Sequence, residues 1–270
     1  VIGSAIADGR GNWSFTTAAQ SDGDKSITVR QTDVAGNTSA ASLPIVVTID
    51  TQIAAPIIES VGTDTGASST DKITSDATLE IQGTAESGAT VFVTVNNVVV
   101  GSVVADTNGQ WRFTTTALND GEKIISVTQT DVAGNASAPS LEYKMTVDTT
   151  VSPPTIDNVG TDTGVVGDRI TADNTLFIQG SAEPGALVDV RIDGVSVGTV
   201  IADASGQWSL ITAVQTDGTK SITAVQTDVA GNSSMPSTGY AITVDTAVLP
   251  PTITSVGCDT GVPGDRMTSE

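Results

Sequence analysis

The hexapeptide TDVAGN occurs three times in this chain, and the residues around it recur with it. The copies begin at positions 32, 130 and 227, so they are offset by 98 and then by 97 residues. The three tryptophans follow the same spacing, and so do the IDT or VDT tripeptides and the GTDTG or GCDTG pentapeptides. Such a long and strict period is typical of tandem domains, so function has to be assigned to a repeating module.

The period also predicts where the domains begin and end. Two complete domains of about 97 residues fit, at 51–148 and 149–245. Residues 1–50 then correspond to the C-terminal part of one repeat, and residues 246–270 to the start of another. We expect 1–50 not to close into a complete domain, and to show disorder or non-native strand pairing instead.

The acidic composition limits the partners of this chain. Asp and Glu total 31 against 11 Lys and Arg, which gives a formal net charge of −20. Nucleic acids and anionic membranes reward basic surfaces, so we expect neither as a partner. No apolar run reaches the roughly 18 residues of a membrane span, so no direct membrane insertion is expected. Divalent cations are compatible with the charge.

The alternation of apolar residues predicts an all-β fold. Val91, Val93 and Val95 alternate with Phe92 and Thr94, and short runs of this kind end at turns rich in Asp, Asn and Gly. About seven such strands fit into each repeat, and no segment has a helical period. The predicted fold is therefore a tandem array of immunoglobulin-like β-sandwiches of about 97 residues, arranged as a rod, with the tryptophans in their cores.

Four motifs in fixed order connect the repeats to a known family. AExG, DxxGxW, TDxAGN and VDT follow one another in both complete repeats. This pattern resembles the bacterial Ig-like repeats of giant surface adhesins, of the SiiE and biofilm-associated kind, and the resemblance covers essentially the whole chain. It implies an extracellular location on a bacterial cell surface, export by type I secretion, and a rod stiffened by calcium.

The strand order predicts where the acidic residues gather. Successive strands of a sandwich alternate in direction, so the AExG, DxxG and DVAGN turns fall at the pole where the chain enters the domain, beside the last residue of the preceding repeat. Oxygen donors without His or Cys select a hard cation such as calcium. We predict a calcium ion at each junction. The candidate ligands are Asp50, Glu86, Asp106, Asp131 and Asn135 at one junction, and Asp148, Glu183, Asp203, Asp228 and Asn232 at the next.

A second calcium site is predicted at the opposite pole. Asp162 and Asp168 stand six residues apart in TDTGVVGD, and Asp259 and Asp265 repeat this spacing, whereas the earlier copy has Asp64 and Asp71. Isolated β-turns also prefer Asp, Asn and Gly, so each motif taken alone is explained by turn formation. The interpretation as a site depends on the convergence of several acids at one pole.

Three functions follow as hypotheses. The first is a stalk segment of an adhesin, whose partners are the neighbouring repeats and whose host-cell or matrix receptor is bound by a region outside this chain. The second is a glycan-binding module in each repeat, which exposed aromatic residues would favour. The third, an enzyme, is not expected, because the chain has no His and only one Cys, and because a catalytic site copied in every repeat has no rationale.

Overall fold

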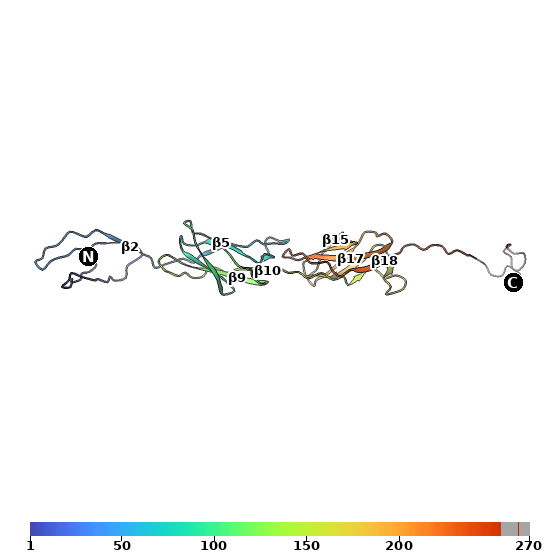
Figure 1. The fold of residues 1–270 in the computed structure, drawn as a ribbon, viewed down its shortest axis with the longest axis horizontal. Helices are drawn as coiled ribbons and strands as arrows, with labels where there is room; N and C mark the ends of the chain where they lie inside the picture. The colour runs from blue at the N-terminus through green and yellow to red at the C-terminus, as the bar shows by residue number, and fades with distance from the viewer. Residues whose placement is uncertain (255–263, 265–270) are drawn as a thin grey trace. The chain divides into compact units, whose positions relative to one another are not determined.

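The structure, a computed structural model, describes residues 1–254 and 264. It divides into two compact units, Val1–Thr149 and Thr150–Glu270. Every regular element among the described residues is a β-strand, which Figure 1 shows as arrows along the chain. The predicted all-β fold of Ig-like sandwiches is therefore confirmed. None of the residues described forms a helix with the length and hydropathy that crossing a membrane requires.

In the first unit, two sheets make one complete sandwich. Their strand orders are β3-β5-β8 and β4-β10-β9-β6-β7, and β9 and β10 run side by side in Figure 1. The neighbours are antiparallel except for β4, which runs parallel to β10. The strands are β3 (Ile57–Val61), β4 (Ile73–Thr74), β5 (Glu80–Thr84), β6 (Thr90–Val95), β7 (Val98–Val104), β8 (Gln110–Thr114), β9 (Gly121–Thr130) and β10 (Tyr143–Val147).

The second unit repeats this topology, with sheets β11-β13-β16 and β12-β18-β17-β14-β15. Its strands are β11 (Asn158–Val159), β12 (Ile170–Thr171), β13 (Phe177–Ser181), β14 (Leu187–Ile192), β15 (Val195–Ile201), β16 (Gln207–Ile211), β17 (Gly218–Thr227) and β18 (Tyr240–Val244). The apolar alternation in the sequence did not predict β4 and β12. Both are two-residue strands whose partners are far along the chain, so they leave no local alternation to detect.

Each sandwich has one apolar core between its two sheets. The inward faces of β5, β6 and β9 supply Ile81, Val91, Val93, Ile125 and Val127, all fully buried, and β13, β14 and β17 supply the corresponding residues of the second unit. Trp111 and Trp208 are each only 3% exposed, so their predicted core position is confirmed. Most of the core residues are Val and Ile, β-branched residues that suit a pleated surface.

Residues 1–50 form a two-stranded sheet rather than a sandwich. Its strands are β1 (Gly23–Ile27) and β2 (Ile45–Ile49), and Gly23 pairs with Ile49 just as Gly121 pairs with Val147 in the complete repeat. The expectation of non-native pairing is therefore wrong for these strands, because the register is set by the same local pattern. The sheet has no second layer, and Trp13 is 54% exposed as a result.

The close packing of Gly180 against its neighbours gives a first prediction. A Cβ atom built on Gly180 would lie 2.0 Å from the Thr155 carbonyl oxygen and 2.6 Å from Cζ2 of Trp208. We expect Gly180→Ala to lower the free energy of unfolding by about 1–3 kcal/mol or more, through overpacking. Gly239→Ala is the control, since its nearest atom lies 3.6 Å away. Urea unfolding of both variants tests this, and equal stability of the two would contradict it.

Candidate metal centre

The turn after β9 is closed by its own aspartate. Asp131 Oδ1 accepts a hydrogen bond from the backbone N–H of Asn135 at 2.8 Å, and Asp131 Oδ2 accepts one from Asn135 Nδ2 at 2.8 Å. Asn135 Nδ2 also donates to the backbone carbonyl of Asp50 at 3.1 Å. One asparagine thus joins the turn to the last residue of the preceding repeat.

These bonds act on the ionisation of Asp131. Burial of the carboxyl group would raise the pKa of Asp131, but hydrogen bonds from the Asn135 side chain and from the backbone N–H groups of Asn135, Gly134 and Ala133 outweigh it. The resulting pKa lies below its ordinary value, because these donors favour the charged form. The carboxylate is therefore ionised at neutral pH and available as a ligand.

A buried glutamine in β9, two residues before Asp131, fixes the neighbouring loop. Gln129 is 2% exposed. Its Oε1 accepts from the backbone N–H of Glu86 at 2.8 Å, and its Nε2 donates to the carbonyl of Ala54 at 2.8 Å. The AESG loop that carries Glu86 and the incoming linker are therefore held by the same side chain. The sequence interpretation missed this residue, although a glutamine precedes TDVAGN in all three copies, at Gln31, Gln129 and Gln226.

The third loop of the pole is attached through its backbone. The N–H of Ala85 donates to the carbonyl of Gly109 at 2.8 Å. Asp106 begins this loop, and its Oδ1 accepts from the backbone N–H groups of Asn108 and Gln110 at 2.8 and 2.9 Å. Asp106 therefore caps its own turn in this structure.

Three of the predicted ligands come together at this pole. Asp50, Glu86 and Asp131 each offer one carboxylate oxygen, and these oxygens lie within 4.8 Å of one another. Asp131 is buried, Asp50 is half-buried and Glu86 is exposed. Asp106 lies outside this group of three. Asn135 supports the group through its amide nitrogen, which donates to Asp131 and to the Asp50 carbonyl.

The charge of this cluster is not balanced by protein groups. In the described part of the chain, no Lys or Arg forms an ion pair with Asp50, Glu86 or Asp131. Like charges about 4 Å apart repel by about 1 kcal/mol in water and by about 4 kcal/mol near a protein surface. Three carboxylates supply up to six oxygens, and calcium takes about six to eight oxygen ligands. The donor set therefore fits a calcium ion.

The second unit has the same local geometry at its own pole. Asp228 accepts from the backbone and side-chain N–H groups of Asn232, both at 2.8 Å. Gln226 Oε1 accepts from the Glu183 N–H at 2.8 Å, and Gln226 Nε2 donates to the Ser152 carbonyl. Asp203 caps its own turn, where hydrogen bonds from Ser205 and from the Gln207 N–H lower the pKa of its carboxyl group. Glu183 and Asp228 are thus held by the same kinds of hydrogen bonds as Glu86 and Asp131.

Thr149 and Thr246, which follow the last Asp of each complete repeat, are each held by two hydrogen bonds to one aspartate. The sequence interpretation missed this clamp as well. Asp120 Oδ1 accepts from both the N–H and the Oγ1 hydroxyl of Thr149, at 3.1 and 2.8 Å. Asp217 holds Thr246 in the same way. The recurrence of Asp-Gly in the NDG and TDG turns was the available signal. This clamp fixes the end of the strand that leads to Asp148 or Asp245.

The acids predicted for the opposite pole serve mainly as turn caps. Asp64 Oδ2 accepts from the Lys72 N–H at 3.0 Å, and Asp71 Oδ1 accepts from the Ile73 N–H at 3.1 Å. In the second unit, Asp162 Oδ2 accepts from the Gly167 N–H at 2.6 Å, and Asp168 Oδ1 from the Ile170 N–H at 2.9 Å. Asp259 and Asp265 lie outside the described residues. Among those described, these acids form no group of three within mutual reach.

Comparison with known proteins places the chain in a family. The bacterial Ig-like domain family matches residues 1–51, 52–149 and 150–246, so the chain belongs to it. This family is non-catalytic, which confirms the prediction that the chain is not an enzyme. No curated protein matches the chain.

Several solved structures resemble the chain at low identity. The BSP domain of a biofilm associated protein is 17% identical, with a TM-score of 0.29 over 70% of this chain and 30% of that one. A 1.5-MDa bacterial ice-binding adhesin is 23% identical, with a TM-score of 0.38 over 83% of this chain and 74% of that one. Fibronectin(III)-like modules of CbhA from Clostridium thermocellum are 18% identical, with a TM-score of 0.31 over 69% and 92%.

The role of Gln129 predicts a stability loss that does not depend on metal. We expect Gln129→Met to lower the free energy of unfolding by about 1–3 kcal/mol for each partner left unpaired, namely the Glu86 N–H and the Ala54 carbonyl. The loss should already be present with a chelator in chemical denaturation, because both hydrogen bonds form without metal. Gln110→Met, at an exposed position of β8, serves as the control. A Gln129→Met variant as stable as that control would contradict the prediction.

The lowered pKa of Asp131 predicts a pH dependence. A carboxyl group whose folded pKa lies below its unfolded value of about 3.9 stabilises the fold above that value, and this contribution is lost as pH falls through the folded pKa. In calcium-free buffer, the native chain should be more stable than Asp131→Asn at pH 7, and the difference should shrink below about pH 4. Urea midpoints measured from pH 7 to pH 2 test this. A difference that stays constant over that range would argue against it.

Proposed function

We propose that this chain is a stalk segment of a large bacterial surface adhesin, with calcium bound at the junctions between its repeats. The observation that carries the proposal is the cluster of Asp50, Glu86 and Asp131. It joins the last residue of one repeat to two loops of the next, and no Lys or Arg among the described residues forms an ion pair with it. A site that needs two repeats is a joint between them.

Two side chains next to the cluster, those of Asn135 and Gln129, fix the direction of the linker. Asn135 bonds to the Asp50 carbonyl, and Gln129 bonds to the Ala54 carbonyl, so the linker is attached at two points without metal. A bound calcium ion would supply the positive charge that offsets the repulsion of the three carboxylates. Rotation of one repeat against the next would then break oxygen contacts to the ion, which makes the joint stiff.

Repeat equivalence extends the proposal to the next junction. Asp148 corresponds in sequence to Asp50, and Glu183 and Asp228 correspond to Glu86 and Asp131. Pro153 and Pro154 follow Asp148 within a few residues and restrict the linker backbone further. We infer that Asp148 completes a second calcium site of the same composition. Asp106 and Asp203 support these sites by shaping the third loop. We propose the pairs Asp64 with Asp71 and Asp162 with Asp168 as ligands of a separate site at the opposite pole.

Location and partners follow from this role. The sequence resemblance to adhesin repeats supports a bacterial cell-surface location and export by type I secretion. Extracellular calcium modules bind with dissociation constants of about 10⁻⁴ to 10⁻³ M, so the joints would be loaded outside the cell and empty inside it. The receptor would be bound by a part of the protein outside this chain. The repeats of this chain would hold that part away from the cell.

Calcium should stabilise the chain through the cluster. At tenfold excess over its dissociation constant, one ion adds about 1.4 kcal/mol, which corresponds to a rise of about 5–10 °C in Tm for a domain of this size. We expect Glu86→Gln to lose calcium binding at one site in titration calorimetry and to lose part of the rise. Scattering should also show a larger maximum dimension with calcium than with a chelator.

The matched control is Glu122→Gln, which removes the same charge at the beginning of β9, away from the cluster. It should bind calcium like the native chain. If neither the Tm nor the maximum dimension changes with calcium, the proposal of a calcium joint is wrong.

A further inference from the structure

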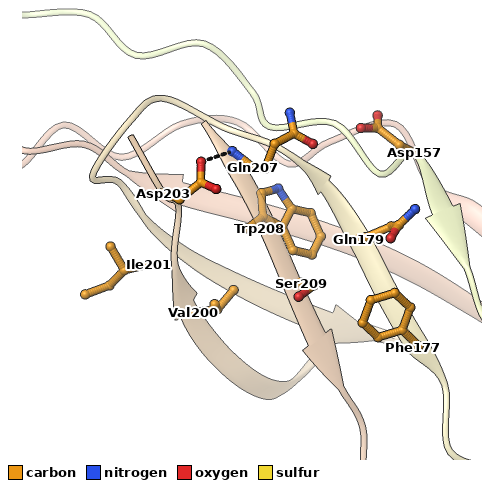
Figure 2. A pocket seen from close by; sticks show the side chains of 9 residues that line it. All are labelled: Asp157, Phe177, Gln179, Val200, Ile201, Asp203, Gln207, Trp208 and Ser209. Atoms are coloured by element: carbon orange, nitrogen blue, oxygen red, sulfur yellow. Dashed lines mark hydrogen bonds between the residues drawn. The ribbon is translucent and has the colours of Figure 1, made fainter. Parts of the chain in front are cut away.

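A groove on the second unit contains none of the three carboxylates proposed as calcium ligands at a junction, and shares only Asp203 with the supporting loops. It has a volume of about 380 Å³ and opens over the outer face of β13 and β16, bordered by the edge strand β15. Figure 2 shows the side chains that surround it. The residues that define its chemistry are Asp157, Phe177, Gln179, Ile201, Gln207 and Ser209.

Strand alternation places these side chains on one face. On β13, Phe177 and Gln179 flank the fully buried Ile178, and on β16, Gln207 and Ser209 flank the buried Trp208. Gln179 stands directly opposite Ser209 in the antiparallel register. The groove therefore has an apolar end at Phe177 and a polar end toward Gln207, as Figure 2 shows.

The preceding repeat has the same strands but a different surface. The positions of Phe177 and Ser209 are taken there by Glu80 and Arg112. Arg112 donates to Glu80 Oε2 at 3.2 Å and to the Oε1 atom of the glutamine equivalent to Gln179, Gln82, at 3.1 Å. A long basic side chain thus lies across the face and occupies its polar groups.

In the described part of the second unit, no Lys or Arg side chain lies across this face. The Gln179 side chain has no hydrogen-bond partner among the described residues, so it offers both a donor and an acceptor. The Asp203 carboxylate also lines the groove, and its Oδ1 is the atom that caps the adjacent turn. Phe177 is 40% exposed, and Ile201, which also lines the groove, is 66% exposed. An uncovered aromatic ring thus lies in one groove with the unpaired amide of Gln179 and with two carboxylates, Asp157 and Asp203, which already accept hydrogen bonds from nearby residues and keep lone pairs for further donors.

This combination matches the chemistry of a sugar. A hexose presents an apolar C–H face, which packs on an aromatic ring, and a rim of hydroxyl groups, which bond to amides and carboxylates. The groove contains two carboxylates, Asp157 and Asp203, and no Lys or Arg. The chain as a whole has a net charge of −20, so an acidic sugar would be repelled. We propose that the groove on this repeat binds a hexose unit without acidic groups, either neutral or amino-substituted.

A peptide fits these observations less well. An added peptide strand is held chiefly by the unpaired backbone groups of an edge strand. Although β15 and β16 are edge strands, the groups that give this groove its chemistry are the side chains of Phe177, Gln179 and Ser209. The proposal also limits glycan binding to the repeat with Phe177 and Ser209, whereas the broader hypothesis assigned it to every repeat.

The test is titration calorimetry on the full chain with four probes: a glucose oligosaccharide, a glucosamine oligosaccharide, a galacturonic acid oligosaccharide and a lysine-rich peptide. We expect saturable binding of at least one of the two non-acidic sugars, and none of the acidic sugar. The double variant Phe177→Glu with Ser209→Arg should weaken that binding at least tenfold. It carries the residue pair that the preceding repeat already accommodates in this register, so it should fold. Phe177→Ala, which only removes the ring, should weaken the same binding.

Val195→Glu is the control, since it adds a charge to β15 at an exposed position outside the groove. Binding should be the same with calcium and with a chelator, which separates this proposal from the calcium joint. The proposal is overturned if neither non-acidic sugar binds, if only the acidic sugar or the peptide binds, or if the double variant binds as tightly as the native chain.

Discussion

The inward-facing row of β9 connects the core of the domain to the candidate metal centre. Ile125 and Val127 are fully buried in this row, and the next two positions on the same side are the buried Gln129 and Asp131. The strand alternation that packs the apolar core thus continues without a break into the polar groups at the pole. β17 repeats this with Ile222, Ala224, Gln226 and Asp228. The position of the acidic cluster therefore depends on the register of one strand, since a shift by one residue would turn Asp131 to the opposite face.

The same aspartate serves both the turn and the cluster. Asp131 accepts hydrogen bonds from its own turn, and it also reaches the carboxylates of Asp50 and Glu86. Turn formation and metal binding were alternative interpretations of TDVAGN, yet the geometry makes them compatible, because a carboxylate has about four lone-pair positions. Asp106 shows the other outcome, in which the turn alone accounts for the residue. The difference between these two acids lies in what surrounds each turn.

The two complete repeats keep the same interior and differ on their outer surfaces. Positions such as Trp111 and Trp208, or Gly83 and Gly180, are retained because each glycine lies against the tryptophan ring and a backbone carbonyl. Glu80 and Arg112 form an ion pair on the outer sheet of one repeat, where the other has Phe177 and Ser209. The ion pair is exposed and contributes at most about 1 kcal/mol to stability. Such positions can therefore change without loss of the fold, and they are where a repeat can acquire a function of its own.

The sequence by itself determined the period, the all-β class, the core tryptophans and the set of acids at the entering pole. These follow from local rules, since alternation and turn residues act within a few positions of the chain. Only the tertiary structure decided that Asp50, Glu86 and Asp131 come together while Asp106 caps its own turn, and that Gln129 and Asp120 hold the linkers. It also decided the pairing of β4 and β12, and the exposure of Phe177 beside a free Gln179. Each of these depends on contacts between residues far apart in the chain, whose distances are set by how the sheets pack and not by the order of the residues.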